Sequence, residues 1–259
     1  MENPNLISVV IITFNESENI ARCIQSVKKI ADEIIVVDSL SMDNTVEIAQ
    51  SLGAKIISQP FLGYIEQKNF AKNLAQHNWV LSIDADECLS ENLQVQIQNL
   101  KANIHLANAY SFNRLTNYCG KWIKHCGWYP DKKLRLFNKN THHWGGFNPH
   151  DKIITGPHDK IIHINDNILH YSFKSYAHFK LQMEKFSLIS AQSYFNKGKK
   201  ASLLKIYGSA ITKFIKSFIF KLGFLDGKAG WIICTRSTYY TYLKYKTLRD
   251  LWRNNTTNI

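Results

Sequence analysis

Residues 7–38 read ISVVIITFNESENIARCIQSVKKIADEIIVVD, and this stretch decides the fold. Its two ends, Ile7–Thr13 and Glu33–Val37, are runs of β-branched residues, typical of parallel strands that are buried on both faces. Between them the apolar residues have helical spacing, at Ile20, Cys23, Ile24 and Val27. A strand, a helix and a second strand in this order predict a βαβ unit with a right-handed crossover.

The alternation of strands and helices continues as far as Ser90. Asn15, with Glu18 three residues later, has the spacing of a capping box and predicts where the first helix begins. The later elements are expected, in chain order, at Thr45–Leu52 (helix), Lys55–Ser58 (strand), Ile65–Ala75 (helix) and Trp79–Ile83 (strand), with Ser90 capping the next helix. This alternation predicts an α/β fold with a Rossmann-like, mostly parallel sheet flanked by helices.

Polar residues follow three of the predicted strands at their carboxyl ends, where open α/β sheets bind ligands. They are Thr13, Asn15 and Glu16 after the first strand, Asp38, Ser39, Ser41 and Asp43 after the second, and Asp84, Asp86 and Glu87 after the fourth. Asp84 and Asp86 form a D-x-D pair, two hard oxygen ligands that suit Mg²⁺ or Mn²⁺ holding a diphosphate. No glycine-rich phosphate loop follows the first strand, so the pattern disfavours dinucleotide-binding and P-loop proteins.

Charge is distributed unevenly along the 259 residues. The first hundred residues hold six Lys/Arg against 13 Asp/Glu, whereas the remainder holds 26 against seven. This asymmetry predicts an acidic catalytic half and a basic half that meets an anionic partner, for which phosphate, anionic lipid and nucleic acid are candidates. Five scattered cysteines, and no recognisable secretory signal or membrane-spanning stretch, predict a cytoplasmic location.

Four segments carry a resemblance to family 2 of the glycosyltransferases. They are SVVIITFNESENIARCIQSV (8–27), EIIVVDSLSMDNT (33–45), GYIEQKN (63–69) and WVLSIDADE (79–87), in the order and spacing of that family. The resemblance implies a GT-A fold and transfer of a sugar from a nucleotide-sugar donor. Within the family, the chain is similar to the lipopolysaccharide-core β-1,4-glucosyltransferases through Leu134–Phe137 (LRLF), His150-Asp151 and His170-Tyr171-Ser172.

The resemblance implies a nucleoside pocket at the first two strand ends. Its expected residues are Thr13, Asn15, Glu16 and Asp38. A carboxylate at the position of Asp38 can accept a hydrogen bond from the imide N–H of uracil, which fits UDP. Lys68 and, with it, Asn69 are expected to contact the nucleotide or its diphosphate. The alternative for Lys68 is a solvated lysine on a helix.

The resemblance also implies a metal site at the D-x-D pair. Asp84 is expected to face the ribose, and Asp86 to hold the Mn²⁺ or Mg²⁺ that neutralises the departing UDP. His170 is either a third metal ligand or phosphate contact, or a packing residue at the end of an apolar segment. Arg135 either neutralises phosphate or forms a structural ion pair.

Inverting transfer requires a base that takes the proton of the acceptor hydroxyl. Asp151 is the expected base, and Asp131 is its rival. The related enzymes carry Glu where this chain has Asp151, which shortens the side chain by one methylene group. The resemblance implies a hexose, with glucose expected, transferred from a UDP-sugar to a glycolipid or lipopolysaccharide-core acceptor.

The C-terminal third is basic and rich in aromatic residues. Residues 197–253 hold 13 Lys/Arg and two acids, Asp226 and Asp250. We expect a catalytic domain over 1–172, with a nucleotide-binding half (1–100) and an acceptor-side half (101–172). A helical basic region (173–253) and a flexible tail (254–259) follow. The basic region either packs on the sheet or meets an anionic membrane, as a peripheral protein on the inner face of the cytoplasmic membrane.

Two other functions remain open from the sequence. A nucleotidyltransferase that makes sugar nucleotides would carry a glycine-rich basic loop after the first strand, which this chain lacks. A non-catalytic module that binds nucleic acid or an anionic surface would use the basic half but leaves the D-x-D pair unexplained. No nucleic-acid-binding signature is present, so we expect no nucleic acid partner.

Overall fold

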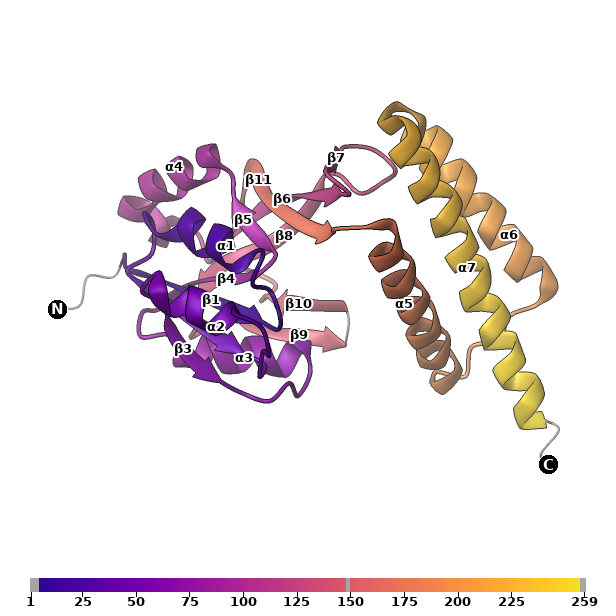
Figure 1. The fold of residues 1–259 in the computed structure, drawn as a ribbon, viewed down its shortest axis with the longest axis horizontal. Coiled ribbons are helices and arrows are strands. Elements are labelled where there is room, and N and C mark those ends of the chain that lie inside the picture. The colour runs from indigo at the N-terminus through magenta and orange to yellow at the C-terminus, as the bar shows by residue number, and fades with distance from the viewer. Residues whose placement is uncertain (1–4, 148–149, 257–259) are drawn as a thin grey trace. The chain divides into compact units, whose positions relative to one another are not determined.

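Four parallel strands form one half of the main sheet in the computed structural model, which describes residues 5–147 and 150–256. Across the sheet they are β3 (Lys55–Ser58), β2 (Glu33–Asp38), β1 (Ile7–Thr13) and β4 (Trp79–Asp84). Every pairing among them is parallel, as the buried β-branched runs predict. The expected α/β class is confirmed (Figure 1).

Three helices connect these strands: α1 (Ile20–Val27), α2 (Thr45–Ser51) and α3 (Tyr64–Leu74). The expectation that Asn15 caps α1 is wrong, because the N-cap is Asn19 and its side chain makes no capping hydrogen bond. Asn15 instead adopts a left-handed conformation, with φ of 53°. There its N–H donates to Ser41 Oγ, and its Oδ1 accepts from the N–H of Met42. Asn15 therefore joins the loop after β1 to the loop after β2.

The strands beyond β4 bring antiparallel pairing into the sheet. They are, in order, β8 (Asp131–Asn138), β6 (Ala109–Tyr118), β11 (Ile161–Phe173) and β5 (Glu87–Leu89), with β7 (Lys121–Ile123) paired to β6. β9 (His143–Phe147) and β10 (His150–Ile154) form a separate hairpin. The helix α4 (Glu91–Leu100) is capped by Ser90 as predicted, and a 3₁₀ segment (Lys101–Leu106) follows it.

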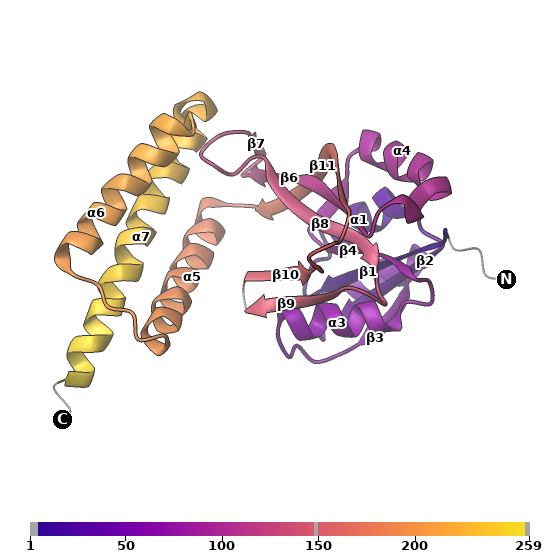
Figure 2. The same ribbon diagram turned by 180° about the vertical axis from the view of Figure 1, so that it is seen from behind.

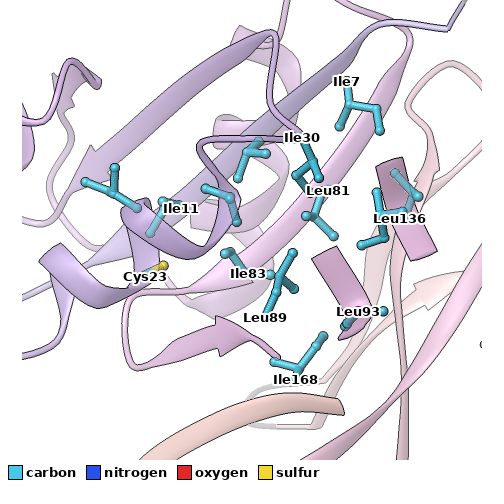
Figure 3. Packing of buried hydrophobic residues seen from close by; sticks show 14 of the residues in the cluster. Ile7, Ile11, Cys23, Ile30, Leu81, Ile83, Leu89, Leu93, Leu136 and Ile168 are labelled. Atoms are coloured by element: carbon cyan, nitrogen blue, oxygen red, sulfur yellow. The ribbon is translucent and has the colours of Figure 1, made fainter. Parts of the chain in front are cut away.

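Apolar side chains pack on both faces of the sheet. On one face, α1, α2 and α4 cover Ile11, Leu81 and Leu136 (Figure 3). On the other face, α3 and the β9–β10 hairpin cover residues such as Val10 and Val80. Successive side chains of a strand point to opposite faces, so each of these strands contributes apolar side chains to both packed layers. The polar residues after those strands are therefore held at a defined edge.

The C-terminal part of the chain is helical. It consists of α5 (Tyr176–Asn196), α6 (Leu203–Phe214), a π-helical turn (Ile215–Phe220), a 3₁₀ turn (Gly223–Asp226) and α7 (Gly227–Thr256). The long helix α7 packs against both α5 and α6 (Figure 2). None of the helices in the described ranges is long and apolar enough to cross a membrane.

The described residues divide into two compact units. One unit holds the chain as far as Arg114 together with Asp131–Tyr171, and the other holds Leu115–Pro130 and the chain from Ser172 onward. The intervening segment Leu115–Pro130 therefore groups with the C-terminal helices. Of the predicted flexible tail, residues 254–256 belong to α7, and residues 257–259 lie outside the described part of the chain.

Candidate active site

Three parallel strand ends lie side by side at the edge where ligand binding was expected. Thr13 is the register partner of Asp38 on β2, and Ile12 is the partner of Asp84 on β4. The N–H of Ala85 donates to the carbonyl of Ile12, with an N···O distance of 3.2 Å. The sheet register thus brings residues from three separate motifs to neighbouring positions.

Asp38 is the centre of a preformed polar cluster. This residue is 2% exposed, and its two carboxylate oxygens accept hydrogen bonds from the N–H (2.9 Å) and the hydroxyl (2.5 Å) of Ser41. Nearby, the N–H of Glu16 donates to the hydroxyl of Thr45 at 2.8 Å. Thr13 Oγ1 is buried and has no hydrogen-bond partner within the described residues. That hydroxyl is therefore a polar group still able to gain from a ligand or a water molecule.

Asp84 is paired with two cations. Lys68 Nζ lies 3.1 Å from its Oδ1, and Arg135 Nη2 lies 3.1 Å from its Oδ2. Burial raises the pKa of Asp84, but the charges of Lys68 and Arg135 outweigh burial and hold that pKa well below its usual range. Asp84 is therefore ionised throughout the physiological pH range.

Glu87 connects Arg135 to a further ion-pair group. Its Oε1 lies 2.7 Å from Arg135 Nη2 and 3.4 Å from Arg114 Nη1. Arg114 also donates from Nε and Nη2 to Asp131 Oδ2, at 3.0 and 2.8 Å. Burial lowers the pKa of Arg135, but Glu87 and Asp84 outweigh burial and raise that pKa. The guanidinium is therefore permanently charged, and its Nε and Nη1 are buried without an acceptor among the described residues.

Lys68 links Asp84 to Asp151, the expected base. Its Nζ lies 2.8 Å from Asp151 Oδ2 and 4.4 Å from the centre of the Trp144 ring. The next residue of α3, Asn69, exchanges two hydrogen bonds of 2.9 Å with the backbone of Trp144. Both polar atoms of the Asn69 amide are thus engaged with β9. The expected contact of Asn69 with the nucleotide stays a prediction. α3 thereby fixes the hairpin that carries Asp151.

Asp86 is paired with His170, which comes from β11. Asp86 Oδ2 lies 3.0 Å from His170 Nε2, and both side chains remain partly exposed, at 24% and 14%. Burial raises the pKa of Asp86, but the charge and hydrogen bond of His170 outweigh burial, so that pKa is lowered. The carbonyl of Asp86 accepts from the N–H of Tyr171 at 2.8 Å, which fixes the turn after β4.

The Asp86–His170 pair fits a divalent cation. Two neighbouring ligands of an octahedral ion, each about 2.1 Å from it, lie about 3 Å apart. Asp86 Oδ2 and His170 Nε2 are 3.0 Å apart and joined by a hydrogen bond, so both could reach one cation that replaced it. Within the described ranges, no group of three or more His, Cys, Asp or Glu side chains is placed to hold a metal alone. Such an ion would complete its shell with substrate phosphate oxygens and water, as Mg²⁺ commonly does.

The predicted residues fall into two adjoining groups, both within the larger unit. The nucleoside group holds Thr13, Asn15, Glu16 and Asp38, and the charged group holds Lys68, Asp84, Asp86, Asp131, Arg135, Asp151 and His170. Sequence reasoning missed Arg114 and gave Glu87 no role. The sequence signal for them was a charged residue inside an otherwise buried strand, Glu87 in β5 and Arg114 in β6. Charged residues are rarely buried unless they are paired. Arg114 and Asp131 are register partners on β6 and β8.

Comparison with known proteins assigns the family. The model of glycosyl transferase family 2 matches residues 8–156. An uncharacterized glycosyltransferase of Rickettsia prowazekii is 37% identical over 258 residues, covering 95% of this chain and 87% of that protein. The lipopolysaccharide core biosynthesis glycosyltransferase LpsC of Rhizobium meliloti is 25% identical over 255 residues, covering 92% of this chain and 89% of that protein.

Solved structures show a more distant likeness. S. aureus TarS (1–349) has a TM-score of 0.44 at 15% identity, covering 96% of this chain and 92% of that chain. Glucosyl-3-phosphoglycerate synthase of Mycobacterium tuberculosis has a TM-score of 0.48 at 18% identity, covering 71% of this chain and 77% of that chain. The family match sets aside the nucleotidyltransferase and the non-catalytic binding module. With a GT-A fold and a C-terminal helical extension, the chain belongs to glycosyl transferase family 2.

Proposed function

We propose that this glycosyltransferase is an inverting, metal-dependent enzyme that moves a hexose from a UDP-sugar to a glycolipid or lipopolysaccharide-core acceptor. The observation that carries the proposal is the position of Asp84 and Asp86 at the end of β4, beside Thr13 and Asp38. The similarity to LpsC supports the acceptor class. Glucose is the hexose that we expect, from the resemblance to the lipopolysaccharide-core glucosyltransferases.

The nucleoside lies, in this proposal, against Thr13, Asn15, Glu16 and Asp38. Asp84 faces the ribose, and its two cationic partners lie where they offset the negative charge of the diphosphate. Lys68 and Arg135 are both nearly buried, at 5% and 3% exposed, so their charges act through a poorly screened environment. Arg135 also has two buried nitrogens, Nε and Nη1, whose N–H groups could be satisfied by water or an anionic oxygen.

Asp86 and His170 would hold the divalent cation. Bound there with the diphosphate, Mn²⁺ or Mg²⁺ supplies Lewis-acid stabilisation of the leaving group. Asp86 is the anionic ligand, and His170 either joins it as a ligand or orients its carboxylate. As an orienting partner, His170 Nε2 would keep its 3.0 Å hydrogen bond to Asp86, whereas as a ligand it would give the lone pair of that nitrogen to the cation instead.

Asp151 acts as the base. Its carboxylate accepts the proton of the acceptor hydroxyl as that oxygen forms a bond to C1 of the hexose, and the bond from C1 to the diphosphate oxygen breaks. Its position beside Lys68, which also contacts Asp84, supports this role. Asp131 is the weaker candidate, because among the described ion pairs two cations, Arg114 and Lys133, engage its carboxylate, against one, Lys68, at Asp151.

A position on the inner face of the cytoplasmic membrane belongs to the same proposal. A lipid-linked acceptor would be met there, and the excess of Lys/Arg in residues 197–253 suits an anionic bilayer.

Thermal unfolding with UDP tests the nucleotide and metal site. UDP with Mn²⁺ should raise the melting temperature of the wild type more than either alone, since a ligand that binds the folded state stabilises it. Asp86→Ala should abolish this gain, whereas the matched control Glu91→Ala, an exposed carboxylate in the first turn of α4, should keep it. A gain that is independent of the metal, or unchanged in Asp86→Ala, would refute the assigned site.

A further inference from the structure

Apolar side chains line one exposed face of α6 and the turn that follows it. Leu204 is 84% exposed, Tyr207 55% and Ile211 60%. Their spacing of three and four residues places them on one side of the helix. Beyond α6, the same character continues in a set of exposed apolar residues: Ile215, Ile219, Phe220, Leu222, Phe224 and Leu225. An apolar surface of this length is unusual unless it binds something.

This exposed face is not the one that packs α6 into the helical unit. Ile206 and Ala210 are buried and lie on the other side of α6. Ile206 belongs to a cluster with Leu248 of α7 and Ala191 of α5. One face of α6 therefore packs inside the helical unit, and a second apolar face of α6 is exposed.

Positive charge accompanies the apolar face. Residues 197–225 contain seven lysines and no acidic residue. Lys205, Lys213 and Lys216 are exposed on α6 and the π-helical turn. The first acid after this stretch, Asp226, is 4% exposed, and its carboxylate accepts from the N–H groups of Lys124 and His125. Within residues 197–225, the exposed charge beside the apolar residues is therefore all positive.

We propose that this face, formed by residues 203–225, docks on an anionic lipid bilayer. The apolar side chains enter the boundary between headgroups and acyl chains, and the lysines meet lipid phosphates. Tyr207 and Trp231, which is 52% exposed at the start of α7, are amphipathic rings suited to that depth. A second copy of the chain fits less well, because a two-fold contact would set these lysines against one another, with no acid in residues 197–225 to pair with them.

Vesicle flotation tests this docking. The wild type should float with vesicles of phosphatidylcholine mixed with phosphatidylglycerol, and much less with phosphatidylcholine alone. Leu204→Ser with Ile211→Ser should lower the partition coefficient about tenfold or more, because two apolar side chains no longer enter the lipid. Leu181→Ser with Leu188→Ser, at exposed positions on α5, is the matched control and should change it little.

Charge is tested by Lys205→Gln with Lys216→Gln, which should lower binding to the anionic vesicles about tenfold. The docking proposal is overturned if the wild type does not float with anionic vesicles, or if the α5 control loses as much binding as the α6 variant. It is equally overturned if light scattering shows a dimer that Leu204→Ser with Ile211→Ser dissociates, since a second copy then covers the face. Vesicle binding requires neither donor nor metal, so failure of the proposed transfer reaction would leave this result untouched.

Discussion

The Nζ of Lys68 lies 2.8 Å from Oδ2 of Asp151, a residue 83 positions later in the chain. On its other side the same Nζ contacts Asp84, so one buried ammonium group separates two carboxylates. Without that charge the two carboxylates would repel each other, and Asp84 would keep only Arg135 of its two cationic partners. Lys68 therefore sets both the electrostatics of the nucleotide side and the place of the proposed base.

Replacing Lys68 should destabilise the fold and remove activity. Lys68→Met leaves Asp84 and Asp151 without their shared cation, and we expect a loss of about 3 kcal/mol in the free energy of unfolding, measured in urea. Lys101→Met is the control, because Lys101 and Asp32 form a more exposed pair, with side chains 18% and 27% exposed. That change should cost about 1 kcal/mol or less. Equal losses in both variants would contradict the bridging role.

The base is tested by two isosteric substitutions. Asp151→Asn should reduce transfer by about 10²- to 10⁴-fold, the range for loss of a general base, while leaving UDP binding close to that of the wild type. Asp131→Asn should leave most of the activity, since two cations, Arg114 and Lys133, hold the carboxylate of Asp131. Transfer assays with a lipopolysaccharide-core acceptor and calorimetric titration of UDP separate the two effects. The opposite ranking would make Asp131 the base.

The link between His170 and the metal is tested on the same strand. His170→Gln should raise about 10- to 100-fold the Mn²⁺ concentration needed for half of the UDP-dependent thermal gain, since partners of a metal ligand commonly contribute that much. His163→Gln is the control, because His163 also lies on β11 but contacts Ser111. An unchanged Mn²⁺ requirement in His170→Gln would show that His170 only packs.

Acid stability should depend on Asp43. Burial raises the pKa of Asp43, but hydrogen bonds from Thr45 and Ser17 outweigh burial and lower that pKa to about 2. A carboxyl group with a lowered folded-state pKa stabilises the protein above its unfolded pKa of about 4 and loses that contribution as the pH falls. In Asp43→Asn the free energy of unfolding should therefore fall less steeply than in the wild type between pH 4 and pH 2. Chemical denaturation at each pH measures it, and Glu91→Gln should retain the wild-type slope.

The parallel half of the sheet could be predicted because its signals are local. Ile7–Thr13 and Trp79–Asp84 are short apolar runs that end on a polar residue, and the order of strands and helices then follows from βαβ geometry. The failed cap at Asn15 has the opposite cause. Its hydrogen bonds go to Ser41 and Met42 in the next loop, so a tertiary contact replaced the local one.

The charged group was only partly predictable for the same reason. Asp84 and Asp86 lie at the end of an apolar strand and stand out in the sequence, whereas the pairing of Glu87 with Arg114 depends on β5 and β6 lying on either side of β11. The grouping of Leu115–Pro130 with the C-terminal helices was likewise invisible, because Asp226 reaches the N–H of His125 across 101 residues.

Release of nucleotide from UDP-, GDP- and dTDP-hexoses in the presence of Mn²⁺ tests the central claim most directly, because it requires no knowledge of the acceptor. We predict that UDP-hexoses are hydrolysed fastest, that chelation of the metal stops the release, and that folded Asp86→Ala is inactive. Release that persists without a divalent cation, or that is undiminished in Asp86→Ala, would contradict the account.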